Sequence, residues 1–140
     1  RHKAYREAMP DLITTFQHVP THPGLVPSML YAQVKLGLCE EVVRNATGAM
    51  QLDTGSTDLL NIRAYCLLRT GDHANARKDI DRSMAKRADY GEIWYLKAWA
   101  LHQAGDRAAC CEALVKSLPK PMSDADLRLE RDRLYGRQCR

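Results

Sequence analysis

Apolar side chains recur at helical spacing along most of the chain, in paired segments that glycine separates. Between residues 58 and 86 the apolar positions form two stripes with three- or four-residue spacing, the first made of Leu59, Leu60, Ala64 and Leu67 and the second of Ala76, Ile80 and Met84. Gly71 and Asp72 lie between the stripes. A glycine followed by a short polar residue is typical of one helix ending and another beginning. The pattern predicts two helices joined at Gly71.

The glycine between the paired helices recurs at a fixed interval. Gly37, Gly71 and Gly105 are each separated by 34 residues. The hydrophobic pattern around the other two glycines predicts further helices over residues 25–36, 38–52, 92–104 and 107–118. A last helix is predicted at 127–138, after acidic first-turn residues at 124 and 126. Its narrow apolar stripe (Leu127, Leu134, Tyr135) predicts that it covers the preceding helices, with Arg128, Arg131, Arg133 and Arg137 coating the rest.

A helix–turn–helix unit that repeats every 34 residues resembles the tetratricopeptide repeat family. With the glycines at repeat position fifteen, the small residue of position eight is Ala64 and Ala98, whereas the first copy has Leu30. The proline usual at position thirty-two is absent from all three copies. The resemblance implies an all-α, right-handed helical-hairpin solenoid in one domain, with repeats at 23–56, 57–90 and 91–122 and a capping helix at 123–140.

The first twenty residues fit the end of an earlier repeat. Tyr5, Ala8, Leu12 and Pro20 match its expected aromatic, small, large apolar and proline positions. Residues 1–20 therefore resemble the second helix of a truncated repeat, and the chain is expected to be a fragment of a larger protein. Self-association through the uncovered side of this helix is a further expectation.

Charge, hydrophobicity and cysteine content limit the partners and the cellular compartment that we expect. Half of the net charge of +4 lies in the last dozen residues, where acids are interleaved, so we expect no nucleic-acid partner. No apolar run approaches the length of a membrane span, which predicts no membrane partner. Five cysteines without metal-ligand spacing predict free thiols in a reducing compartment, and hence a cytoplasmic protein.

Catalytic constellations are missing from the sequence. No nucleophile elbow, phosphate loop or dinucleotide fingerprint is present. His18 and His22 are four residues apart, but Pro20 between them prevents a shared helix face. We expect no enzymatic activity, no metal and no cofactor.

A second face of the first helix of each repeat carries a recurring aromatic residue. Position nine is Tyr31, Tyr65 and Trp99. The predicted partner-binding face consists of Tyr31, Lys35, Asn61, Ile62, Tyr65, Arg69, Tyr95, Leu96, Trp99 and His102. The resemblance implies that this face lines a concave groove for a partner's peptide or helix. Alternatively, these aromatics pack on neighbouring first helices or on the terminal helix.

The best-known ligand of the family, the acidic tail of heat-shock chaperones, is not expected here. Its carboxylate clamp needs lysine, asparagine and arginine at five positions that here are Pro27, Tyr31, Ile62, Glu92 and Leu96. The favoured function is a non-catalytic protein-interaction module of a scaffold, adaptor or co-chaperone. The alternatives are a targeting domain of a larger enzyme, such as an immunophilin-like isomerase or a phosphatase, and a chaperone for secreted bacterial subunits.

Overall fold

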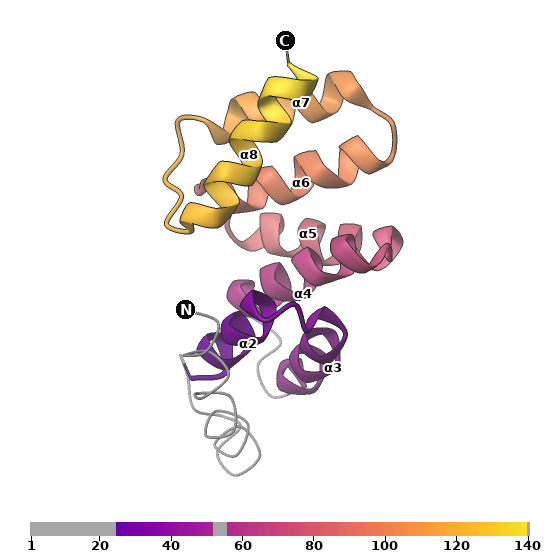
Figure 1. The fold of residues 1–140 in the computed structure, drawn as a ribbon, viewed down its shortest axis with the longest axis vertical. Coiled ribbons are helices and arrows are strands. Elements are labelled where there is room, and N and C mark those ends of the chain that lie inside the picture. Colours follow the sequence, from indigo (N-terminus) through magenta and orange to yellow (C-terminus); the bar gives the residue numbers. More distant parts are fainter. Residues whose placement is uncertain (1–24, 52–55, 140) are drawn as a thin grey trace. The chain divides into compact units, whose positions relative to one another are not determined.

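Helices account for the regular structure throughout the described part of the chain. The structure is a computed structural model that describes residues 25–51 and 56–139. The predicted helix over residues 1–18, and the self-association assigned to it, lie outside this part. The helices are α2 (Leu25–Lys35), α3 (Cys39–Met50), α4 (Thr57–Thr70), α5 (His73–Lys86), α6 (Gly91–Gln103), α7 (Arg107–Ser117) and α8 (Ala125–Gln138) (Figure 1).

The helix boundaries reproduce the 34-residue period. The second helices of successive repeats begin at Cys39, His73 and Arg107, and α4, α6 and α8 begin at Thr57, Gly91 and Ala125. Gly37, Gly71 and Gly105 have positive φ angles of 77°, 92° and 81°. These values place all three in the left-handed region, where glycine is tolerated without a side-chain clash. The predicted helix breaks are therefore confirmed.

The chain divides into two compact units, Arg1–Asp72 and His73–Arg140, which we describe separately. In the first unit α2 packs against α3, and α4 packs against both. Met29, Leu30, Val42 and Leu60 are buried between these helices. Ser56 begins α4 by accepting a hydrogen bond from the Leu59 amide at 3.2 Å, as expected of an N-cap serine.

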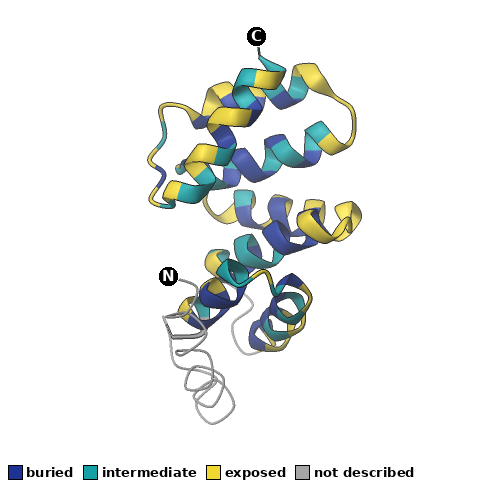
Figure 2. Cartoon of the chain, in the orientation of Figure 1, coloured by how far each residue is buried: buried dark blue, intermediate teal, exposed yellow. Residues whose placement is uncertain are grey.

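In the second unit α6 packs against α5 and α7, and α8 packs against both α6 and α7. The core around α8 contains Tyr95, Ala98, Cys110, Ala113, Leu114, Met122 and Leu134. Dark blue, buried positions accordingly line the inner sides of α6 and α7 in Figure 2. The predicted covering role of the last helix is confirmed. One detail was wrong, because Arg131 is buried instead of coating the surface.

Arg131 is buried because its guanidinium finds polar partners inside the unit. Its Nη1 donates to the backbone oxygen of Ser117 at 3.4 Å, and its Nε donates to Asp132 at 3.0 Å. Gly91 also permits close packing nearby, since a Cβ atom there would lie 2.2 Å from Cγ of Met122. The start of α6 and the segment before α8 therefore approach each other closely at a residue that has no side chain.

Candidate functional site

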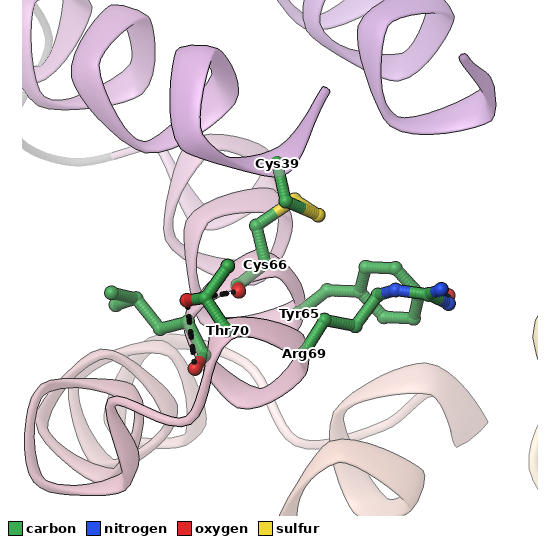
Figure 3. The surroundings of a disulfide bond; sticks show 6 residues. Cys39, Tyr65, Cys66, Arg69 and Thr70 are labelled. Atoms are coloured by element: carbon green, nitrogen blue, oxygen red, sulfur yellow. Dashed lines mark hydrogen bonds between the residues drawn. A yellow bond between two sulfur atoms is a disulfide. The ribbon is translucent and has the colours of Figure 1, made fainter. Parts of the chain in front are cut away.

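On α2 and α4, each recurring tyrosine is followed four residues later by a cation. Lys35 Nζ lies 4.6 Å from the centroid of the Tyr31 ring, and the Arg69 guanidinium lies 5.6 Å from that of Tyr65. Arg69 Nη1 also donates a hydrogen bond to the Tyr65 hydroxyl at 3.0 Å (Figure 3). The four-residue spacing places both members of a pair on one helix face. Two equivalent aromatic–cation pairs thus stand on helices that contact each other.

The exposure of this face is uneven. Tyr31 is 36% exposed, and Asn61 and Ile62 are half-buried. Tyr65 is only 9% exposed. As part of the predicted partner-binding face, Tyr65 was expected to be partly exposed, and this was wrong. The residue is buried, and its hydroxyl accepts a hydrogen bond from Arg69, an exposed residue. Of the two aromatics between residues 25 and 72, Tyr31 is therefore the accessible one.

A disulfide bond lies directly beside Tyr65. Cys39, the first residue of α3, is bonded to Cys66 of α4, with 4.9 Å between their Cα atoms. Tyr65 and Cys66 are consecutive, and their side chains point in different directions (Figure 3). The Cα distance lies within the usual range for a disulfide. The bond holds α4 against α3 while Tyr65 faces elsewhere.

A second disulfide joins Cys111 of α7 to Cys139 after α8, with 5.2 Å between the Cα atoms. Cys110 is free and buried, and burial raises the pKa of its thiol, with the Asp106 carboxylate adding to the shift. The prediction of free thiols was therefore wrong for four of the five cysteines. Sequence spacing did not reveal the pairs because the bonded cysteines are 27 and 28 residues apart and meet only when separate segments pack together.

The aromatics of α6 are packed more deeply than expected for a binding face. Tyr95 and Leu96 are buried, at 4% and 1% exposed. The Tyr95 hydroxyl donates to a Glu130 carboxylate oxygen of α8 at 2.9 Å. For Tyr95 the alternative interpretation, packing against the terminal helix, is the one observed. Trp99 is half-buried with its ring centroid 6.0 Å from that of Tyr95, and His102 is also half-buried.

Within residues 25–51 and 56–139, no group of three or more His, Cys, Asp or Glu side chains is arranged to hold a metal ion. In the same part of the chain, no helix is long and apolar enough to cross a membrane.

Solved structures with the same arrangement of helices identify the fold. A thermophilic TPR protein from Thermus thermophilus aligns with a TM-score of 0.76 over 94% of this chain and 73% of its own, at 18% identity. MamA aligns with a TM-score of 0.72 over 82% of this chain and 67% of its own, at 16% identity. The first TPR domain of human RPAP3 aligns with a TM-score of 0.65 over 79% of this chain and 87% of its own, also at 16% identity.

This chain has the tetratricopeptide-repeat fold. The suspected resemblance and the all-α helical-repeat architecture are confirmed at the level of fold. No protein-family model and no curated protein matches the sequence. The likeness is therefore one of structure. Ala64 and Ala98, the small residues at position eight, are fully buried.

Of the five positions compared above with a carboxylate clamp, two carry residues that have a structural role in this chain. Glu92 Oε2 accepts hydrogen bonds from the Ser123 and Asp124 amides at 2.9 and 3.1 Å. Leu96 is buried in the core. One position therefore holds an acid that fixes the start of α8, and the other holds an apolar packing residue. Neither can attract a carboxylate.

Proposed function

We propose that this chain is a non-catalytic module that binds a peptide or helix of a protein partner. The surface of the first unit consists of Tyr31, Lys35, Asn61, Ile62 and Arg69, with buried Tyr65 supporting it. In the second unit, half-buried Trp99 and His102 offer a separate contact region. Buried Tyr95 lies beside Trp99, and Leu96 is a core residue. The observation that carries the proposal is the pair of aromatic–cation contacts, 34 residues apart, on two adjoining helices.

Several features support a binding role for Tyr31. It is a large, exposed aromatic side chain, and the cation beside it is held over its ring. Aromatic and arginine side chains supply much of the binding energy at protein interfaces. A partner with apolar anchors for Tyr31 and Ile62 and with acids near Lys35 and Arg69 fits this surface. Scaffold, adaptor and co-chaperone roles all use such binding.

Peptide selection followed by mutagenesis tests the proposal. The oxidised chain is used to select binders from a library of displayed random peptides, and the enriched peptides are synthesised and titrated. Tyr31→Ala should weaken their binding by about tenfold or more, the loss typical of a hot-spot side chain. Because Tyr31 is partly exposed, its replacement should leave the chain folded, with only a modest fall in melting temperature.

Leu129→Ala is the matched control, because Leu129 is a large apolar side chain that is 55% exposed on α8. The selected peptides should bind this variant as they bind the parent chain. Peptides whose affinity is insensitive to Tyr31→Ala, or equally sensitive to Leu129→Ala, would contradict the proposed surface.

We also infer that the protein works in an oxidising compartment, instead of the cytoplasm that the sequence predicted. Disulfides persist in extracellular, periplasmic and endoplasmic-reticulum environments and are rare in the cytosol. Each of the two compact units contains one such bond. This inference rests on the cysteine pairs alone and is independent of the proposed binding surface.

A further inference from the structure

Three lysine side chains gather around one tryptophan in the second unit. The Nζ atoms of Lys97, Lys116 and Lys120 lie 5.5, 5.1 and 5.9 Å from the centroid of the Trp94 ring. Lys97 belongs to α6, Lys116 to α7, and Lys120 to the turn that follows α7. All three ammonium groups lie within 6 Å of the centroid of the same ring, and we name this group of residues the Trp94 lysine cluster.

The tryptophan at the centre of the cluster is fixed and accessible. Trp94 Nε1 donates a hydrogen bond to the Ala88 backbone oxygen at 2.8 Å, which sets the orientation of the indole. The residue is half-buried, so part of the ring faces solvent. Trp94 also packs against the hydrophobic core around α8. Its N–H is satisfied and part of its apolar surface remains available.

The charges of the cluster are only partly compensated. Lys116 pairs with Glu112 at 3.8 Å, but both side chains are more than half exposed, and such pairs contribute little. Asp89 is engaged by Arg87 at 2.7 Å. That hydrogen bond is the main reason the pKa of the Asp89 carboxyl is lowered, and Lys120 contributes less. Cation–π attraction offsets part of the repulsion between the lysines. An anionic ligand would offset more of it.

The arrangement favours several separate carboxylates over one compact anion. The cations are three separate ammonium groups from three segments, each able to pair with one carboxylate, and none offers the paired N–H groups with which an arginine holds one phosphate. We propose that the Trp94 lysine cluster binds an acidic peptide segment of a protein partner. The Glu or Asp carboxylates contact the lysines, and the methylene groups of the segment lie on the indole.

This site is distinct from the proposed partner-binding surface, since it shares no residue with it. The competing explanation is structural, because lysine stems often cover apolar surface while their ammonium groups stay in water. That explanation predicts no ligand. The two explanations therefore differ in whether an acidic peptide binds and whether binding depends on these lysines.

The probe is a capped ten-residue peptide of alternating Glu and Gly, titrated into the full oxidised chain at physiological ionic strength. A matched peptide with Gln in place of Glu is the neutral control. Binding is followed through the indole N–H resonance of Trp94, identified by its loss in Trp94→Phe. We expect this resonance to shift with the Glu peptide and to stay in place with the Gln peptide.

Charge reversal then tests the lysines. Lys116→Glu/Lys120→Glu should weaken binding of the Glu peptide by about tenfold or more, because like charges then face the ligand. Lys78→Glu/Lys86→Glu changes the net charge equally at exposed positions of α5 and should change affinity by less than about twofold. All four lysines lack deep burial, and circular dichroism checks that each variant stays folded.

Three outcomes would overturn the proposal. The first is an unchanged Trp94 resonance with the Glu peptide. The second is an equal loss of affinity in the α5 control variant, which would show that net charge alone acts. The third is tighter, equally lysine-dependent binding of single-stranded oligouridylate, which would assign the cluster to a different polyanion.

Discussion

A single backbone angle decides where α4 ends. Gly71 has a φ of 92° and follows the last residue of the helix. Its amide donates to the Leu68 oxygen at 3.3 Å, and the Asp72 amide donates to the Leu67 oxygen at 2.9 Å. A left-handed residue at this point lets the last carbonyl groups of the helix find partners.

Gly71→Ala should lower the free energy of unfolding by about 1–2 kcal/mol, because a Cβ atom is disfavoured in the left-handed region. Gly48→Ala is the matched control. Gly48 lies inside α3, and a Cβ atom there would meet nothing within 4 Å. That change should stabilise the chain by about 0.5–1 kcal/mol. Urea unfolding of both variants gives the comparison, and destabilisation of the same size in each would contradict it.

Residues whose role depends only on their neighbours along the chain were predictable from the sequence. The hinge glycines and the N-cap acceptors Ser56 and Asp106 belong to this group. The burial of Tyr65 was not predictable, because it depends on which side chains from other segments cover the ring. The same holds for Trp94, whose lysine neighbours come from positions up to 26 residues away in sequence.

At the scale of elements, helix positions followed from periodicity to within about two residues. The residues that attach α8 to its neighbours could not be predicted from periodicity. Glu92 illustrates the difference, since its Oε2 accepts bonds from the Ser123 amide, the Ser123 hydroxyl and the Asp124 amide. No sequence pattern links a carboxylate at the start of α6 with amides more than thirty residues later.

Glu92→Ala should destabilise the second unit by about 1–2 kcal/mol, because the amides at the start of α8 lose their acceptor. Amide exchange should increase in the first turn of α8. Glu112→Ala removes an exposed carboxylate paired only with Lys116 and should cost less than about 0.5 kcal/mol. Unchanged exchange at residues 123–128 in Glu92→Ala would show that the contact does not hold α8.

For the whole molecule, the cysteine pairs are the largest departure from the sequence-based expectation. Counting cysteines predicted thiols because no spacing indicated a metal site or a small disulfide framework. Pairing became evident only when packed helices brought Cys39 to Cys66 and Cys111 to Cys139. The repeat architecture, by contrast, was evident from the period, because each 34-residue unit repeats its own local pattern.

Chain produced under oxidising conditions should contain one titratable thiol in denaturant, and five after reduction. Without denaturant, Cys110 should react slowly near neutral pH, since it is buried and its raised pKa leaves little thiolate. The reaction should accelerate as pH rises. Thiol titration checks these counts, and five reactive thiols before reduction would contradict both the pairing and the inferred compartment.

The two disulfides also set how far the chain can be stretched by force. Each bond removes the residues it encloses from the extensible backbone, with sequence separations of 27 and 28. At about 3.4 Å per extended residue, the oxidised polypeptide is roughly 180 Å shorter at full extension than the reduced one. A pulling force therefore reaches only the segments outside Cys39–Cys66 and Cys111–Cys139. Between the paired cysteines, the disulfide bond carries the load in place of the enclosed backbone.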